Sequence, residues 1–326
     1  MKYSRIIGTG SFLPERVLTN KDLEQILDTS DEWIVTRTGI SERRIAGEKE
    51  HTSDLAAQAA RRALEMAGLT AGDIDLIVVA TVTGDFSWPA TACMVQTLIG
   101  ADRAFAFDVS AACSGFLYGL ATADNFLRSG SARRALVIGA EIFSRIVDWE
   151  DRATCVLFGD AAGAVVLEQQ EGDRGILSTH LHSDGSFWEL LYQPGFGSRN
   201  PYDGKGGTAQ PPYLQMKGNE VFKVAVRSLY EVAIEALGAN GMTVDDIDWF
   251  IPHQANNRII EAAAKRLELP LEKLVVNVSR VGNTSGASIP VALDEINRNG
   301  SLNPGNIILM DAFGAGFTWG SALIRW

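Results

Sequence analysis

Cys113 lies where an α/β protein would hold a nucleophile. It follows an apolar stretch, residues 104–109, and precedes a segment with apolar residues near one face, residues 116–127. A strand, a turn and a helix in this order put the sulfur at a helix N-terminus, where unpaired N–H groups and the helix dipole favour a thiolate. The pattern therefore predicts a nucleophilic cysteine. A small buried hydrophobic side chain is the alternative interpretation.

Two further residues have types and positions suited to chemistry. His253 follows a short apolar strand, residues 249–251, and Pro252, so it lies at a strand end, where open α/β sheets keep their sites. Asn283 lies in a turn of small residues, 282–288, that opens a helix. A structural histidine and a helix-capping asparagine are the alternatives.

The other two cysteines are interpreted as core residues. Cys93 lies in a helix-like run and Cys155 in a strand-like run, residues 155–158. Three cysteines without a CxxC spacing, beside only four histidines, indicate neither a disulfide framework nor a zinc site. We therefore expect no metal.

The elements that must position these residues alternate between strands and helices, which predicts an α/β fold. Strands 75–80 and 104–109 are apolar on successive residues, as in strands covered by helices on both faces. Landmarks then recur in order: the sequence 73–75 at 246–248, 107–110 at 276–279, and 126–130 at 296–300.

This recurrence predicts two copies of one βα unit, residues 1–172 and 173–326, related by a pseudo-twofold axis. By that duplication, Asn283 is expected at nearly the place of Cys113, and the two turns are expected to meet. Residues 184–212, rich in Gly, Pro and polar residues, are interpreted as a lid or binding loop, or else as a disordered insertion.

Composition excludes several classes of protein. The chain has 29 Lys and Arg against 40 Asp and Glu, a formal charge of −11, which argues against a nucleic-acid binder. No apolar run reaches the ~20 residues of a membrane helix, and the first residues do not form a secretory signal. We therefore expect an intracellular, cytoplasmic protein without membrane insertion.

Three motifs together carry a resemblance to a known family: residues 108–116 (DVSAACSGF), 252–256 (PHQAN) and 282–285 (GNTS). In this order and spacing the chain closely resembles β-ketoacyl-acyl-carrier-protein synthase III, the initiating condensing enzyme of bacterial fatty-acid synthesis. The likeness includes residues 29–34, 36–40 and 312–320 and runs over essentially the whole chain. It implies the thiolase-like fold, a five-layered α-β-α-β-α body built from two duplicated halves.

The resemblance also implies a reaction. Cys113 would attack a short acyl-CoA, with acetyl-CoA as the expected primer, and hold the acyl group, with backbone N–H groups of Cys113 and Ala315 as oxyanion donors. Neutral His253 and Asn283 would stabilise the enolate from malonyl-acyl carrier protein, with no metal or redox cofactor. The products would be a β-ketoacyl-carrier protein, CO₂ and CoA. The family has glycine where this chain has Ala315, so a methyl group could narrow the tunnel mouth.

Further positions match the family's substrate contacts. Trp33 and Arg152 match the pair that sandwiches the CoA adenine, with Arg37 and Thr29 nearby. Asn219 and Asn256 match polar residues along the pantetheine tunnel. A core aromatic and surface salt bridges are the alternatives for Trp33 and the arginines.

Trp88 matches an aromatic at the floor of the acyl pocket, contributed across a homodimer, and predicts acetyl or propionyl primers. Because acyl carrier protein is acidic, we expect a local basic patch to bind it. The candidates lie on two helices: Lys223 and Arg227 on one, and Arg258, Lys265 and Arg266 on the other. A solvated face is the alternative for Lys265.

Three other functions remain open at this point. A specialised relative making a polyketide or quinolone starter would keep Cys113, His253 and Asn283. A cysteine thioester hydrolase or thiol protease could use the same types of residue. A catalytically silent dimeric binding protein would not need all three.

Overall fold

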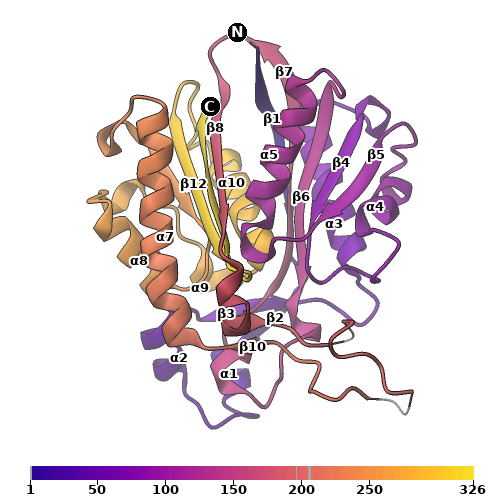
Figure 1. Ribbon diagram of the computed structural model, residues 1–326, viewed down its shortest axis with the longest axis vertical. Coiled ribbons are helices and arrows are strands. Elements are labelled where there is room, and N and C mark those ends of the chain that lie inside the picture. Colours follow the sequence, from indigo (N-terminus) through magenta and orange to yellow (C-terminus); the bar gives the residue numbers. More distant parts are fainter. Residues whose placement is uncertain (1, 196, 205–206) are drawn as a thin grey trace.

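The protein is built in five layers, seen edge-on in Figure 1. The computed structural model describes residues 2–195, 197–204 and 207–326. Two mixed β-sheets each have helices on both faces, and two of those helices, α5 (Gly115–Arg128) and α10 (Ser288–Arg298), share the central layer between the sheets. This is the thiolase-like α-β-α-β-α arrangement that the family resemblance predicts.

The two sheets have matching strand orders. The first runs β1 (Lys2–Phe12), β7 (Asp160–Glu171), β6 (Arg134–Ile142), β4 (Leu76–Ala80) and β5 (Phe105–Val109). The second runs β8 (Gly175–Ser183), β13 (Thr318–Arg325), β12 (Ile307–Gly314) and β11 (Trp249–Pro252). In both orders the first two pairs of neighbouring strands are antiparallel and the third pair is parallel. A single parallel bridge, Phe250 to Leu274, stands where the second sheet would have its fifth strand.

The outer layers consist of helices on the far face of each sheet. The remaining helices are α1 (Asn20–Leu23), α2 (Asp31–Thr38), α3 (Thr52–Ala67), α4 (Thr91–Ile99), α6 (Arg152–Cys155), α7 (Gly218–Ala239), α8 (Asn257–Arg266) and α9 (Val278–Val281). Helices α3 and α4 pack on the first sheet, while α7 and α8 pack on the second. Short strands β2 (Arg16–Thr19) and β3 (Glu42–Ile45) form one antiparallel pair, and β9 (Leu191–Tyr192) and β10 (Gln215–Met216) form another.

The duplication is visible in equivalent hydrogen bonds. The short 3₁₀ helix η1 (Ala71–Asp73) begins with a capping box between Thr70 and Asp73, and η5 (Val244–Asp246) begins with the same box between Thr243 and Asp246. In both cases two donors that the helix leaves unpaired are satisfied before a buried strand begins.

The turns that open the two central helices are also equivalent in the two halves. These are η2 (Ala112–Ser114) and η7 (Ser285–Ala287), and their first residues share a left-handed φ of 47° and 48°. Cys113 therefore matches Gly286. Asn283, expected at nearly the place of Cys113, lies three residues before the matching position, because α9 and Gly282 form an extra turn ahead of η7.

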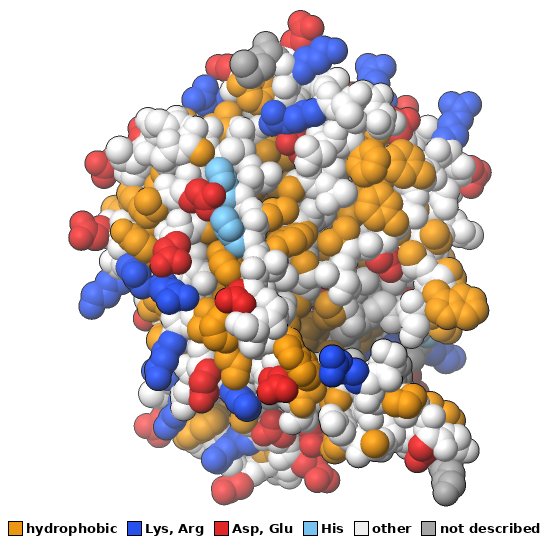
Figure 2. Space-filling model, in the orientation of Figure 1, with side chains coloured by type: hydrophobic (Ala, Val, Ile, Leu, Met, Phe, Trp, Pro, Cys, Tyr) orange, Lys and Arg blue, Asp and Glu red, His pale blue; other side chains and the backbone are white. Residues whose placement is uncertain are grey.

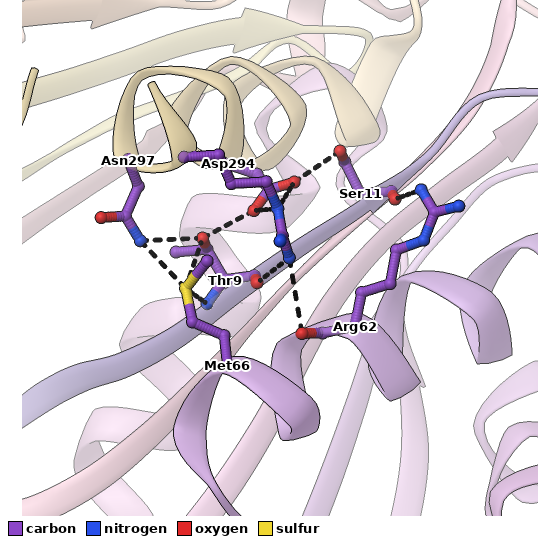
Figure 3. A network of polar contacts seen from close by, with 7 residues as sticks. Thr9, Ser11, Arg62, Met66, Asp294 and Asn297 are labelled. Atoms are coloured by element: carbon purple, nitrogen blue, oxygen red, sulfur yellow. Dashed lines mark hydrogen bonds and ion pairs between the residues drawn. The ribbon is translucent and has the colours of Figure 1, made fainter. Parts of the chain in front are cut away.

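Close backbone approach and a buried polar network join the two halves. A side chain on Gly139 of β6 would lie 2.1 Å from the Gly286 carbonyl oxygen, so only glycine permits this contact. Elsewhere, Asp294 of α10 accepts hydrogen bonds from Thr9 (2.7 Å) and Ser11 (2.6 Å) of β1 (Figure 3). Because Asp294 is buried, these bonds fix the second half's central helix on the first sheet.

The edge strand β5 differs from the prediction. Its residues are only half-buried or exposed, and Phe105 is 41% exposed, so the helices on the two faces cover this strand only in part. Its outer edge has no partner strand in the part of the chain that the structure describes. Figure 2 shows hydrophobic side chains gathered over this strand.

Residues 184–212 contribute partly to the body of the protein. They contain η4 (Gly185–Leu190) and β9, which pairs with β10. Three of the glycine-rich positions, 196 and 205–206, lie outside the described residues. Among the helices that are described, none has the length and apolar character needed to cross a membrane.

Candidate active site

The first half presents Cys113 in the short turn η2, between the end of β5 and the start of α5. The Ser114 hydroxyl donates to the Ala111 carbonyl oxygen at 2.7 Å and lies 2.7 Å from the Thr318 hydroxyl oxygen. Thr318 comes from β13 of the second half, so both halves hold the turn. The sulfur-bearing residue is 7% exposed.

Electrostatics at the thiol differ from the prediction of a ready thiolate. Burial is the largest effect and raises the pKa of Cys113 to about 12, because the charged form loses its water. A hydrogen bond with the Ser285 side chain opposes this shift, and the carboxyl group of Glu141 adds to it. A helix N-terminus alone therefore does not explain how this thiol becomes a nucleophile.

The second half presents His253 at the end of β11. Its backbone N–H continues the sheet by donating to the Asp311 carbonyl oxygen at 2.8 Å. Its Nδ1 lies 2.7 Å from the Ser288 hydroxyl oxygen, so Nε2 is the nitrogen left for a ligand. Burial lowers the pKa of His253 to about 3, which keeps the ring neutral at physiological pH. A neutral ring whose Nδ1 accepts the Ser288 hydrogen carries its own hydrogen on Nε2.

Asn283 is oriented by both its backbone and its side chain. Its N–H donates to the Leu157 carbonyl oxygen at 2.8 Å, and its carbonyl oxygen accepts from the Gly159 N–H at 3.0 Å. Its side-chain Oδ1 accepts from the Ser285 N–H at 2.9 Å. Because Oδ1 is engaged, the amide NH₂ is the group available to a ligand, as a donor.

One cavity of about 980 Å³ brings the three predicted residues together. Cys113, His253, Asn283 and Ala315 all line it. The β12–β13 loop runs close to Cys113: a side chain on Gly314 would come within 2.7 Å of the Cys113 backbone nitrogen. Thr318 fixes this loop by donating to the Ala315 carbonyl oxygen at 3.0 Å.

Residues predicted to contact CoA lie mainly along the same cavity. Its lining includes Trp33, Arg37, Asn219 and Asn256. The Arg152 guanidinium lies 4.7 Å from the Trp33 ring centroid, and that of Arg37 lies 5.3 Å from it. An adenine ring inserted between Arg152 and Trp33 would have to separate this pair.

Two of the predicted CoA contacts, Thr29 and Arg152, are not among the residues that line the cavity. The Thr29 hydroxyl is buried without a hydrogen-bond partner among the described residues. Asn256 lines the cavity and also caps α8, with its Oδ1 accepting from the Ile259 N–H at 3.0 Å. Its amide NH₂ remains as a donor.

The predicted basic patch divides into two groups. Lys223 and Arg258 line the cavity and are exposed. Lys265 and Arg266 are exposed near the end of α8 but do not line it, and Arg266 lies 4.6 Å from the Tyr230 ring centroid. The structure therefore brings only the first pair to the cavity.

Trp88 does not reach the cavity of its own chain. It is 84% exposed, in a loop where Phe86 is 63% exposed. Of the other cysteines, Cys155 is buried as the last residue of α6, and a turn follows it where a strand-like run was predicted, while Cys93 is only half-buried. Among the described residues, no group of three or more His, Cys, Asp or Glu could hold a metal ion.

Sequence reasoning missed three polar residues that support the site. They are Ser285 and Ser288, which touch the catalytic candidates, and Glu141, a buried carboxyl group at the end of β6. One signal was present: Glu141 is an acidic residue directly after an apolar run, residues 135–140. A charge there requires specific partners, because a buried charge without them is costly.

A thiolase-like body with a cysteine, a neutral histidine and an asparagine on one cavity defines a condensing enzyme. Family descriptions for 3-oxoacyl-[acyl-carrier-protein] synthase III match residues 107–185 and, for its C-terminal part, residues 237–326. The beta-ketoacyl-[acyl-carrier-protein] synthase III of Xanthomonas campestris pv. campestris is 59% identical over 329 residues, spanning 99% of this chain and 98% of its own.

Solved structures agree with this match. The 3-oxoacyl-[acyl-carrier-protein] synthase III of Aquifex aeolicus is 51% identical, with a TM-score of 0.93 over 99% of this chain and 100% of its own. A priming beta-ketosynthase from a polyketide biosynthetic pathway is 38% identical, with a TM-score of 0.92 over 99% and 96%. The chain belongs to the 3-oxoacyl-[acyl-carrier-protein] synthase III family and is an acyltransferase of the condensing type.

Proposed function

We propose that the protein condenses a short acyl-CoA with malonyl-acyl carrier protein and so initiates fatty-acid synthesis. One observation carries the proposal: Cys113, His253 and Asn283, from different halves, line one cavity. The cavity also has CoA-matching residues, Trp33 and Asn219, along its wall. The proposal includes a cytoplasmic location, because CoA thioesters are intracellular substrates.

In the first half-reaction, the Cys113 sulfur attacks the acyl-CoA carbonyl carbon and CoA leaves as its thiolate. The carbonyl oxygen becomes an oxyanion, which needs hydrogen-bond donors already in place. The backbone N–H groups of Cys113 and Ala315 are the proposed donors, supported by the close approach of Gly314 to the Cys113 nitrogen. The result is an acyl-cysteine.

In the second half-reaction, the malonyl thioester loses CO₂ and leaves an enolate. Neutral His253, through Nε2–H, and the Asn283 amide donate to the enolate oxygen, whose carbon attacks the acyl-cysteine. Both donors are uncharged, so the site stabilises charge only as it develops. These donors make a metal or redox cofactor unnecessary in the proposed reaction, and chelators are expected to leave the activity intact.

The proposal includes a homodimer that joins two β5 edges. Supporting observations are the open edge of β5 and the exposure of Phe105 and of the loop carrying Phe86 and Trp88. Continuous pairing would remove both exposed edges from solvent. A Trp88 side chain reaching the acyl pocket of a second copy would limit its depth, so we propose acetyl or propionyl primers.

The basic residues at the cavity are proposed to receive the acidic carrier protein. Lys223 and Arg258 carry this proposal, and Lys265 and Arg266 extend the positive surface along α8. We predict that Arg258→Glu weakens carrier-protein binding by about tenfold at low ionic strength, and that salt reduces the difference. Titrating malonyl-acyl carrier protein at two salt concentrations measures this. Equal affinity of both proteins at low salt would contradict the patch.

Intact-mass analysis after incubation with a panel of acyl-CoAs tests the proposed function. We expect a short acyl group on the wild-type protein and none on Cys113→Ser, followed by loss of the group as a β-ketoacyl product when malonyl-acyl carrier protein is added. Release of the free acid instead would indicate a thioester hydrolase.

A priming role in a polyketide pathway is the second candidate. It is favoured by the TM-score of 0.92 to the priming beta-ketosynthase, although the identity of 38% is below the 51% and 59% of the fatty-acid relatives. Competition between two malonyl carrier proteins, one from each type of pathway, separates the two roles. The polyketide role predicts faster condensation with the polyketide carrier.

A further inference from the structure

A buried carboxyl group lies behind the nucleophile, and the reaction described above does not use it. Glu141 is fully buried at the end of β6. Its Oε2 accepts hydrogen bonds from the Thr83 hydroxyl at 2.5 Å and from the Val82 N–H at 3.2 Å. Its Oε1 accepts from the Ser285 hydroxyl at 3.2 Å. Glu141 is not among the residues that line the cavity.

The packing of the two halves explains why Ser285 meets Glu141. Gly139 and Glu141 project from the same face of β6, two residues apart. Because Gly139 has no side chain, the η7 backbone at Gly286 rests directly on this face. That contact holds the Ser285 hydroxyl against the Glu141 carboxylate.

The Ser285 hydroxyl also contacts the nucleophile. A hydrogen bond with Ser285 lowers the pKa of the Cys113 thiol. The two turns touch at this point, since a side chain on Gly286 would lie 3.4 Å from the Ala112 carbonyl oxygen and 3.5 Å from Glu141 Oε1. While the thiol is protonated, the Ser285 hydroxyl hydrogen is donated to Glu141, so its oxygen is left to accept from the S–H group. The Ser285 N–H donates to Asn283 Oδ1, which fixes the residue in place. A single hydroxyl therefore lies between the thiol and the buried carboxylate.

We propose that Glu141 receives the Cys113 proton through the Ser285 hydroxyl during acylation. This inference rests on the proposed function, in which Cys113 is the acyl acceptor. As the sulfur bonds to the thioester carbon, the S–H bond breaks and its proton passes to Ser285 Oγ, while the Ser285 proton passes to Glu141 Oε1. Glu141 becomes neutral and the departing CoA carries the negative charge. In the second half-reaction Cys113 leaves the acyl carbon as a thiolate and takes the proton back along the same path.

The surroundings favour this route over its alternatives. Moving the proton within the cluster creates no second buried negative charge. Burial raises the pKa of Glu141 to about 7, which suits a proton acceptor at neutral pH. His253, with a pKa of about 3, is a poor base. A substrate arm that fills the cavity would also separate the 7% exposed thiol from bulk water.

The groups that face Glu141 are few. Cys113 is the titratable group from η2. The segment after β4 presents the Thr81 and Thr83 hydroxyls, and η7 presents that of Ser285. On the neighbouring strand β7, Ala161 lies opposite. The pKa of Glu141 is therefore set by burial, which raises it, and by these hydroxyls and the Val82 N–H, which lower it.

The variant Glu141→Gln distinguishes a proton acceptor from a carboxylate that acts only through its charge and from one that only positions the thiol. We expect single-turnover acylation by acetyl-CoA at pH 7 to fall about 10²-fold, while alkylation of Cys113 by iodoacetamide, a small probe that leaves water in the cavity, is unchanged or faster. A carboxylate acting only as a buried negative charge predicts that both rates rise. One that only positions the thiol predicts that both fall. Either of these results would overturn the proposal.

Thr83→Val is the matched control, because it removes one hydrogen bond to the same carboxylate but keeps Glu141 and Ser285. The Thr83 bond lowers the pKa of Glu141, so its loss raises that pKa. The ionised carboxylate accepts the proton, so the acylation rate of Thr83→Val should rise with pH as in the wild type, but at higher pH. At high pH its acylation rate should be far above that of Glu141→Gln. An unshifted profile would refute the relay, and thermal unfolding checks that both variants fold.

Failure of the proposed function gives a different result in these experiments. In that case the wild-type protein forms no acyl-cysteine with any CoA thioester, and the relay falls with it. If the wild-type protein is acylated and Glu141→Gln is acylated equally fast, only the relay is wrong. Peptide-level mass analysis keeps Cys113 distinct from Cys93 and Cys155 in both assays.

Discussion

The turns η2 and η7 share one backbone conformation and carry different side chains. Each opens a central helix and begins with a left-handed residue, Ala112 in one and Ser285 in the other. The next residue is Cys113 in the first half and Gly286 in the second. One turn presents the proposed nucleophile. The other presents a hydroxyl and leaves space, since a side chain on Gly286 would lie 3.4 Å from the Ala112 carbonyl oxygen. The duplicated fold has thus divided the roles between its copies.

The strands β6 and β12, which support these turns, are also equivalent in position but carry different side chains. The Asp75 N–H donates to the Arg134 carbonyl oxygen, and the Asp248 N–H donates in the same way to that of Ile307, so Arg134 of β6 and Ile307 of β12 are equivalent. Counted along the strands from these two residues, Glu141 of β6 and Gly314 of β12 are equivalent as well. Glu141 supports the turn of the second half, whereas Gly314 approaches the turn of the first. Each half's strand therefore supports the other half's turn, and neither half holds a complete site.

The largest expected effect comes from removing the side chain that distinguishes η2 from η7. We predict that Cys113→Ala lowers condensation by at least about 10³-fold, because no acyl-enzyme forms. Decarboxylation of the malonyl donor should persist, since its proposed donors lie in the second half. Measuring β-ketoacyl product and CO₂ separately checks this. Loss of both activities together would contradict the division of roles.

Gly314→Ala tests the support that the second half gives to η2. The added Cβ would lie 2.7 Å from the Cys113 nitrogen, so the backbone must move and the proposed oxyanion donors separate. We expect acylation to fall by about 10- to 100-fold, less than the loss of the nucleophile. Single-turnover acylation measures this. A rate within twofold of the wild type would show that the close approach is not needed.

Gly286→Ala is the matched substitution in η7 and should have the smallest effect. Its added Cβ would meet atoms at 3.4–3.5 Å, an ordinary contact, and the position does not have a left-handed φ. We expect acylation and the midpoint of thermal unfolding to stay close to wild type, with rates within about twofold. A loss as large as that of Gly314→Ala would mean that the two turns are equally constrained.

Much of the site could be predicted from the sequence because the chemistry lies in short local motifs. A strand, a turn and a helix around Cys113, and a strand end before His253, follow from hydrophobic pattern alone. The duplication could also be predicted, but not which residues of the two halves are equivalent, because α9 and Gly282 displace Asn283 from the position matching Cys113. Segment 155–158 likewise has a strand-like composition but begins with the last residue of a short helix.

The electrostatics could not be predicted, because they depend on packing between the halves. The pKa of Cys113 is set by burial against the second half, which outweighs the helix N-terminus. Glu141 gave a signal as an acidic residue directly after an apolar run, but its partners Thr83 and Ser285 are distant in sequence and come from separate elements. Only the folded chain brings them together.

The half-reactions of Asn283→Ala test the central claim most directly: that the first half forms the acyl-enzyme and the second half stabilises the enolate. Acylation is followed by intact mass after adding acetyl-CoA, and decarboxylation by CO₂ release from the malonyl donor. We predict that acylation stays within a few-fold of wild type while decarboxylation falls by about 10²- to 10³-fold. An equal loss in both half-reactions would contradict the account.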